Sequence, residues 1–323
     1  MTSNASRETS VDISGDILIL EPAAEAIARA LRAIAPGLSV QLCTDAPGPE
    51  HAAAQICLAR PDLLARHADR LPELRWVQST WAGIRALLPL MAERPELVVT
   101  GVKGIFGPLM AEYLFGWLAM LERSGLEYPA LQQQRRWQPL PQRRMAGRRM
   151  TLIGTGSIGQ HLALVAAAFG VRVTGVSRSG AAVEGFEKVW RVEDRVAAAS
   201  GADYLVSVVP DTPATRGLVD APLLAALAPD SILVNVGRGS AVDDSALIAA
   251  LANRRPRAAV LDVFRTEPLP EGDPLWSTPG VHLTPHVAAT TMADDIAELF
   301  LGNLQRWRGG AALDAVIDAN REY

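Results

Sequence analysis

Three glycines at the spacing G-x-G-x-x-G join a β-branched apolar run to an alanine-rich stretch of helical pattern. In such a strand–turn–helix, Gly154 permits the tight turn, Gly156 lets a pyrophosphate approach backbone N–H groups, and Gly159 allows the helix to pack closely on the strand. The N-terminus of the helix, with Ser157 and Ile158 in its first turn, would face the phosphate charge. The motif in this context predicts a dinucleotide-binding site, with a purely structural glycine turn as the alternative.

The end of the next strand-like run bears on which dinucleotide is bound. A site that prefers NAD usually has Asp or Glu about 20 residues after the glycines, where it bonds the ribose 2′-hydroxyl. Here VRVTGV ends in Ser177, Arg178 and Ser179, without a carboxylate. A planar guanidinium beside two hydroxyls suits a 2′-phosphate, so the hypothesis is a preference for NADPH. Alternatively, Arg178 is a solvated loop residue and both NADPH and NADH are used.

Three charged residues lie at or near the ends of further predicted strands. Arg238 occurs in VNVGRGS, Glu267 in DVFRTEPLP and His286 in TPHVAATT. Singly, each has an ordinary explanation: a surface arginine, a turn glutamate and a structural histidine. Their occurrence in this order after a dinucleotide motif argues against coincidence and indicates a catalytic group.

Short β-branched runs alternate along the chain with Ala- and Leu-rich helical stretches, a pattern typical of parallel strands covered by helices on both faces. Helices are expected at 22–35, 108–125 and within 292–312. Strands are expected at 16–20, 39–43, 55–59, 75–80 and 97–102, and then at 150–156, 171–177, 202–209, 231–236, 258–264 and 281–286. The pattern predicts an α/β fold of two domains with the active site in a cleft between them.

A polar, proline-interrupted segment, QQQRRWQPLPQRRMAGRR (132–149), follows the long helix and is expected to be a linker or surface excursion. Its arginine pairs are interpreted as a solvated face, and a role at a cofactor phosphate is the alternative.

Composition excludes several function classes. The chain has 323 residues, of which 49% are hydrophobic, and a formal net charge of −4. Without a basic excess, nucleic acid is excluded as a partner. No apolar run reaches the length of about 18 residues that a membrane span needs, and the polar first residues contain no signal-peptide core. We therefore expect a soluble, cytoplasmic protein.

The chain's two cysteines, Cys43 and Cys57, have no metal or redox spacing, and we expect buried thiols in a reducing compartment. No His/Cys/Asp cluster has ligand spacing, so no metal is expected.

Taken together, the chain resembles the D-isomer-specific 2-hydroxyacid dehydrogenases from about Arg75 to its C-terminus. The segments that carry the resemblance are GTGSIG, VVPDTPATRGL, VNVGRGSAVDDSALIAAL, LDVFRTEPLP and LTPHVA. The resemblance implies two Rossmann- or flavodoxin-like domains, with the C-terminal helix returning to the first. It places a substrate domain at 1–110 plus 289–323 and a dinucleotide-binding Rossmann domain at 111–288. It also implies a homodimer formed through the second domain.

The resemblance further implies reduction of a small 2-oxo acid, in which the carbonyl carbon receives a hydride and its oxygen a proton. His286 is then the general acid, and the base in the reverse direction. Glu267 would hydrogen-bond the imidazole, fixing its orientation and holding its proton. Arg238 would bind the substrate carboxylate and polarise the carbonyl.

Further site residues follow from the same resemblance. Backbone N–H groups of Trp81, Ala82 and Gly83 would bind the substrate carboxylate, and Trp81 would either wall the pocket or serve only for packing. Asp262 would contact the nicotinamide amide, the alternative being an ordinary acid at a strand end. Pro210 would lie against the adenine.

Other positions leave the substrate open. The family commonly has Asp or Glu after the carboxylate loop, whereas Ile84 and Arg85 follow it here. Trp276 falls where the family often has Trp, and it would line the pocket of its own or of a partner subunit. The segment GIFGPLMAEY (104–113) and the Ser-Arg-Ser strand end favour family members that act on glyoxylate and hydroxypyruvate. The remaining histidines are interpreted as surface or packing residues: His51, His67, His161 and His282.

Three other functions compete with a 2-oxo acid reductase. Formate-oxidising relatives carry Gln at the position of Glu267, so this residue argues against them. Phosphite-oxidising relatives keep the glutamate, so Glu267 does not exclude phosphite oxidation. A cofactor-sensing regulatory protein of this fold would carry disordered tails, and the short tail and complete Arg–Glu–His set argue against it.

Overall fold

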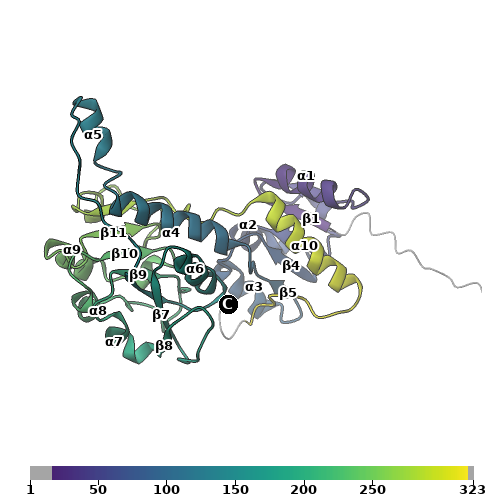
Figure 1. Ribbon diagram of the computed structural model, residues 1–323. Helices are drawn as coiled ribbons and strands as arrows, with labels where there is room; N and C mark the ends of the chain where they lie inside the picture. The colour runs from purple at the N-terminus through teal and green to yellow at the C-terminus, as the bar shows by residue number, and fades with distance from the viewer. Residues whose placement is uncertain (1–16, 319–323) are drawn as a thin grey trace, which may run out of the picture. The chain divides into compact units, whose positions relative to one another are not determined.

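The computed structural model describes residues 17–318, which form two compact units (Figure 1). The terminal unit comprises residues up to Lys103 together with those from Thr291 onward, and the central unit comprises Gly104–Thr290. The expected boundaries at 110 and 289 differ slightly from these. A division at 110 would cut a continuous helix, α4, which packs on α6 of the central unit. The polar N-terminal residues, for which no signal peptide is expected, lie outside the described residues.

The terminal unit is built on a parallel five-stranded sheet with the order β2-β1-β3-β4-β5, which is the flavodoxin-like order. Its strands are β1 (Ile17–Leu20), β2 (Gln41–Cys43), β3 (Ile56–Ala59), β4 (Trp76–Ser79) and β5 (Val98–Thr100). Its helices are α1 (Ala24–Ile34), α2 (Pro61–His67), α3 (Leu88–Glu93) and α10 (Ala293–Arg308). The strands are short and mostly apolar because helices cover both faces.

The C-terminal helix α10 belongs to the terminal unit and packs beside α1. The indole ring of Trp76 on β4 stacks on Phe300 at 5.4 Å and on Trp307 at 5.6 Å, measured between ring centroids. The Trp76 Nε1–H donates to Thr100 Oγ1 at 2.9 Å, so the polar atom of this buried ring is satisfied. Both cysteines are buried free thiols in this unit, and burial raises the pKa of the Cys57 thiol.

The central unit contains a parallel seven-stranded sheet with the order β12-β11-β10-β9-β6-β7-β8. Counted from β6, this is the Rossmann order 3-2-1-4-5-6 with one further strand at the edge. The strands are β6 (Arg149–Ile153), β7 (Arg172–Ser177), β8 (Lys188–Arg191), β9 (Tyr204–Ser207), β10 (Ile232–Asn235), β11 (Ala258–Leu261) and β12 (Val281–Leu283). The strand β8 was not expected from the sequence, since KVWR has a charge at each end.

Helices cover both faces of this sheet. One apolar cluster joins the strands to α4 (Phe106–Glu122) and α6 (Ser157–Ala168). The other joins them to α7 (Arg195–Ala199), α8 (Ala221–Ala226) and α9 (Asp244–Ala252). No helix within residues 17–318 is both long and apolar enough to span a bilayer.

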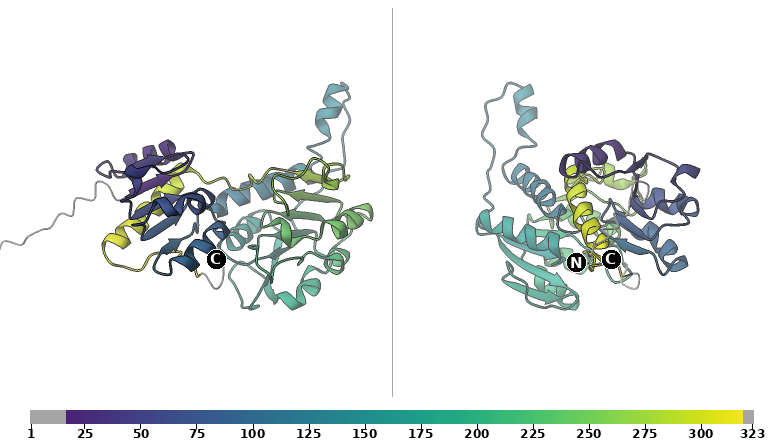
Figure 2. Two further views of the ribbon diagram at one scale, coloured as in Figure 1. Left: turned by 180° about the vertical axis from the view of Figure 1, so that it is seen from behind. Right: turned by 90° about the vertical axis from the view of Figure 1, so that its right-hand side faces the viewer.

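The predicted surface excursion (132–149) overlaps only the end of the short helix α5 (Tyr128–Gln133), which stands away from the body of the central unit (Figures 1 and 2). None of its residues is buried, and Trp137 beyond it is fully exposed. The interpretation of the arginines as a solvated face is wrong for Arg148. Its Nη1 lies 2.8 Å from Asp203 and its Nε 3.5 Å from the buried Glu122, because the chain returns here to the start of β6.

Candidate active site

The glycine turn after β6 has three different requirements for glycine. Gly154 has φ +110°, a conformation that L side chains rarely adopt. A Cβ on Gly159 would collide with the carbonyl oxygen of Gly154, so only glycine lets α6 pack this closely. A Cβ on Gly156, by contrast, would have nothing within 4 Å. The turn is therefore tightly packed on one side and open at Gly156.

That open side adjoins the N-terminus of α6, which has no side-chain cap. The first-turn N–H groups of the helix, including those of Ser157 and Ile158, have no acceptor within the helix and point away from it. Together with the helix dipole, such donors fit an anion, so this turn fits the pyrophosphate of a dinucleotide.

The strand order of the central sheet reverses at this turn, since β6 lies between β7 and β9. In parallel α/β sheets, ligands bind outside the carboxyl ends of the strands at such a reversal. Ser177 ends β7 on one side of the glycine turn, and Pro210 follows β9 on the other. The cofactor residues named from sequence therefore lie along one edge of the sheet. Arg178 at this edge is exposed and has no hydrogen-bond or ion-pair partner among the described residues.

Glu267 and His286 are in direct contact. Glu267 follows β11 and His286 follows β12, the neighbouring strand. The Oε2 atom of Glu267 lies 2.7 Å from His286 Nδ1, and Oε1 accepts the backbone N–H of Phe264 at 2.9 Å. Both side chains are partly exposed, with exposed fractions of 36% and 50%. With Nδ1 engaged by the carboxylate, Nε2 is the ring atom left for a reactant.

The backbone at His286 is held in an unusual conformation. Its φ of +55° lies in the left-handed region, which is uncommon for residues other than glycine. The His286 N–H donates to the carbonyl oxygen of Asp262 at 2.8 Å. The Asp262 carboxylate, which is buried, accepts from Thr284 Oγ1 at 2.6 Å and from the backbone N–H groups of Val287 and Ala288 at 2.8 and 2.9 Å. Asp262 thus fixes the loop that carries His286.

Arg238 lies on the turn after β10, the next strand of the sheet. The following residue, Gly239, packs so closely on Phe264 that a Cβ there would collide with its backbone, which brings this turn against the loop before Glu267. Burial lowers the pKa of the half-buried Arg238 guanidinium, and the carboxylates of Glu267 and Asp211 oppose that effect. The three predicted catalytic residues therefore follow three adjacent strands, β10, β11 and β12.

In the terminal unit, the loop after β4 carries the residues expected to bind a carboxylate. The Trp81 N–H donates to Ser79 Oγ at 3.1 Å, whereas the N–H groups of Ala82 and Gly83 have no acceptor within residues 17–318. The Arg60 guanidinium lies 5.2 Å from the centroid of the Trp81 ring, a cation–π distance. Asp62 holds Arg60 through two hydrogen bonds of 2.6 and 2.9 Å.

Residues 115–288 match the sequence model of the family described as "D-isomer specific 2-hydroxyacid dehydrogenase, NAD binding domain". This chain belongs to the D-isomer-specific 2-hydroxyacid dehydrogenases. The match contains the glycine turn and the strand ends that carry Arg238, Glu267 and His286. An NAD(P)-dependent dehydrogenase accordingly accounts for both the fold and the residues at the sheet edge.

Relatives of known name or structure agree with this family. A glyoxylate/hydroxypyruvate reductase A from Serratia proteamaculans is 31% identical over 285 residues, which cover 86% of this chain and 90% of that protein. A family member from Aeromonas salmonicida is 38% identical with a TM-score of 0.87, covering 95% of this chain and 99% of that one. Another from Xanthobacter autotrophicus, solved with NADPH and MES, is 30% identical with a TM-score of 0.82, covering 96% of this chain and all of that one.

Other residues singled out from sequence make local contacts in this dehydrogenase. His51 Nδ1 accepts the N–H of Gly48, and His161 packs against Gly107. The His282 ring lies 5.5 Å from that of Trp117, and burial lowers its pKa. Trp276 is largely exposed, and its Nε1–H donates to the carbonyl oxygen of Pro270 at 2.9 Å.

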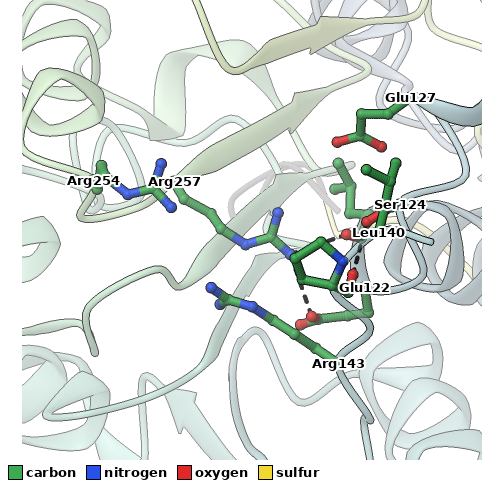
Figure 3. A pocket seen from close by; sticks show the side chains of 9 residues that line it. Glu122, Ser124, Glu127, Leu140, Arg143, Arg254 and Arg257 are labelled. Atoms are coloured by element: carbon green, nitrogen blue, oxygen red, sulfur yellow. Dashed lines mark hydrogen bonds and ion pairs between the residues drawn. The ribbon is translucent and has the colours of Figure 1, made fainter. Parts of the chain in front are cut away.

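A separate cavity of about 250 Å³ lies where α4 ends, near the base of the excursion that carries α5 (Figure 3). Its main feature is the buried Glu122, which accepts from Tyr204 Oη at 2.9 Å and from Arg257 Nη2 at 3.3 Å. Arg143 and Arg254 at its rim both pair with Asp230. None of the predicted site residues lines this cavity. Within the described residues, no group of three or more metal-ligating side chains is assembled.

Proposed function

We propose that this dehydrogenase reduces a small 2-oxo acid of the glyoxylate or hydroxypyruvate type to the D-2-hydroxy acid, with NADPH preferred over NADH. The observation that carries the proposal is the contact between Glu267 Oε2 and His286 Nδ1, which leaves Nε2 to deliver a proton. The similarity to a glyoxylate/hydroxypyruvate reductase supports the substrate class. The NADPH in a related structure supports the cofactor.

The reaction adds a hydride to the carbonyl carbon and a proton to the carbonyl oxygen. A reduced dinucleotide, held through its pyrophosphate at the glycine turn, would supply the hydride. His286 gives the proton from Nε2, and Glu267 keeps Nδ1 protonated throughout, so that the ring is always presented with Nε2 outward. Arg238 stabilises the negative charge that develops on the carbonyl oxygen and binds the carboxylate of the substrate.

The preference for NADPH rests on the end of β7. Ser177, Arg178 and Ser179 place two hydroxyls and one guanidinium there, and no carboxylate that would accept from a 2′-hydroxyl. Pro210 lies against the adenine, and Asp262 contacts the nicotinamide amide in addition to holding its loop. In the terminal unit, the unsatisfied N–H groups of Ala82 and Gly83 bind a carboxylate, and Trp81 forms an apolar wall.

We also propose that the dehydrogenase is a cytoplasmic homodimer formed through the central unit. The excursion around α5 exposes Trp137 completely and buries none of the residues of α5, which fits an element that packs against another chain. Light scattering coupled to size-exclusion chromatography tests the dimer, and a monomeric mass at micromolar concentration would exclude it.

The function is tested with purified protein by following oxidation of NADPH and of NADH. The substrates are glyoxylate, hydroxypyruvate, pyruvate and a bulkier aromatic 2-oxo acid. We expect turnover of the first two, with a higher kcat/KM for NADPH. Equal kcat/KM values for the two cofactors would overturn the preference alone. No turnover of any acid, with NADPH binding intact, would overturn the reductase proposal and direct the search to phosphite oxidation or to a regulatory role.

A further inference from the structure

The strand β8, which sequence analysis missed, places a second arginine beside the Ser-Arg-Ser turn. In the parallel pairing of β7 with β8, Ser177 is the register partner of Arg191, so both residues lie at the carboxyl ends of their strands. The Arg191 Nε–H donates to the carbonyl oxygen of Ser179 at 3.3 Å. Arg191 therefore adjoins the proposed site of the 2′-phosphate, although it lies well beyond Arg178 in sequence.

The turn itself is folded against Arg191. Gly180 has φ +67°, and a Cβ there would come within 2.7 Å of Arg191 Cγ. A side chain at position 180 would strain the backbone and displace the arginine stem. The glycine thus permits the close approach of the two strand ends.

The two hydroxyls of the turn are available as donors. Ser177 Oγ accepts the N–H of Gly180 at 3.1 Å, and Ser179 Oγ accepts the N–H of Ala181 at 3.2 Å. Because each hydroxyl accepts from backbone, its own O–H stays free to donate. Among the described residues neither donates to a protein acceptor. The turn therefore presents hydrogen-bond donors on a positively charged edge, which is the chemistry of an anion site.

A phosphate monoester carries a charge of about −1.5 to −2 at neutral pH, more than one guanidinium balances. Arg178 supplies one positive charge and Arg191 supplies a second. Arg191 has no carboxylate within ion-pair distance among the described residues. Arg172, at the opposite end of β7, differs in that its Nε lies 4.0 Å from Glu187.

We propose that Arg191 is a second determinant of cofactor specificity, which binds the 2′-phosphate of NADPH from the β8 side while Arg178 binds it from the β7 side. The proposal rests on the proposed preference for NADPH and adds to it the residue that would complete the charge balance. Because Nε of Arg191 is bonded to Ser179, its two Nη groups are the ones that contact the phosphate.

The test compares wild-type protein with Arg191→Ala, Arg178→Ala and Arg172→Ala by calorimetric titration with 2′,5′-ADP and with 5′-AMP. These probes share the adenosine 5′-phosphate, and only the first has a 2′-phosphate. We expect Arg191→Ala to weaken 2′,5′-ADP binding by about tenfold or more, as for loss of a charged hydrogen bond, and 5′-AMP binding by less than about twofold. Arg191→Lys should recover part of the loss, because it keeps the charge without the planar guanidinium. Arg172→Ala serves as the matched control, because Arg172 lies at the opposite end of the neighbouring strand β7.

The outcomes separate this inference from the function on which it rests. A loss in Arg178→Ala with none in Arg191→Ala would overturn the role of Arg191 and leave the NADPH preference standing. Equal affinity of wild-type protein for the two probes would overturn both. Loss of 5′-AMP binding in Arg191→Ala, as large as that of 2′,5′-ADP, would mean that Arg191 only maintains the turn, and this too would overturn the proposal.

Discussion

The Oε2 atom of Glu267 lies 2.7 Å from His286 Nδ1, while the other oxygen of the same carboxylate accepts the N–H of Phe264. The carboxylate is therefore fixed through both oxygens before it contacts the imidazole. A carboxylate held in this way determines which ring nitrogen carries the permanent proton and in which direction the other nitrogen points. Glu267 thus acts through His286, and substitutions of the two residues should have different effects.

Substitution of His286 should remove proton transfer and leave cofactor binding in place. We expect His286→Ala to lower kcat for glyoxylate by about a hundredfold or more, because general acid catalysis contributes that much. Binding of NADPH, measured by calorimetry, should change less than about twofold, since the glycine turn lies after another strand. His67→Ala is the control, because His67 is at the end of α2 in the terminal unit. Wild-type turnover in His286→Ala would remove the proton-transfer role.

Substitution of Glu267 should slow proton transfer without removing the proton donor. In Glu267→Ala, His286 Nδ1 and the N–H of Phe264 lose the oxygens that they contact, so the ring is no longer held with Nε2 outward. We expect kcat for glyoxylate to fall by about tenfold, a smaller loss than in His286→Ala, while NADPH binding changes by less than about twofold. Wild-type kcat in Glu267→Ala would show that the carboxylate does not position the ring.

The sequence predicted the two parallel α/β layers because buried parallel strands are short continuous apolar runs, and these are visible without alignment. It also named Arg238, Glu267 and His286 by their order. The contact between Glu267 and His286 was expected from the family resemblance alone, because its 2.7 Å geometry depends on the pairing of β11 with β12 and on the left-handed backbone at His286. The order in which strands pair is not visible in a single sequence. A left-handed backbone is signalled mainly by glycine, and position 286 is a histidine.

Residues that act on other residues were the ones that sequence reasoning missed. Arg60 was overlooked because an arginine before a proline is typical of an ordinary turn. Its contact with the Trp81 ring depends on the ends of β3 and β4 lying side by side. Arg191 was missed with its strand, since KVWR is too short and too polar to stand out. Asp262 was named as a contact of the nicotinamide, but its hold on the His286 loop was not expected. That hold comes from three donors that meet only in the folded chain.

Removal of the Arg238 charge should affect the substrate more than the cofactor. In Arg238→Gln, we expect kcat/KM for glyoxylate to fall by about a hundredfold or more, because the developing negative charge loses its partner. Arg238→Lys should remain well below the wild type, since an ammonium lacks the planar pair of donors that matches a carboxylate. The KM for NADPH is the internal control. An equal rise of the two KM values, without loss of kcat, would indicate a general disturbance of the sheet edge.

Asp262 should contribute to stability as well as to activity. In Asp262→Asn, one accepting oxygen is replaced by an amide that cannot accept from the surrounding N–H and O–H groups. We expect a loss of about 1–3 kcal/mol in the free energy of unfolding, the cost of an unsatisfied buried donor. Urea unfolding followed by circular dichroism measures this loss. Wild-type stability together with reduced kcat would assign Asp262 to the cofactor and not to the loop.

Glu21 offers a prediction on pH-dependent stability in the terminal unit. It follows β1, and burial raises the pKa of its carboxyl, an effect that the hydrogen bond from Thr80 Oγ1 at 2.7 Å opposes. Because the pKa is higher in the folded than in the unfolded chain, the ionised carboxylate costs stability at neutral pH. This cost disappears as the pH falls through the folded-state pKa toward the ordinary value of a glutamate.

The variant Glu21→Gln should therefore unfold at a higher urea concentration than the wild type at pH 7.5. A glutamine can still accept from Thr80 through its amide oxygen, so the hydrogen bond is kept while the buried charge is removed. The advantage should shrink as the pH is lowered, because the wild-type carboxyl then becomes neutral as well. Glu25→Gln on the exposed face of α1 is the matched control and should show no such trend. If Glu21→Gln is less stable than the wild type at both pH values, the ionised carboxylate of Glu21 stabilises the folded chain.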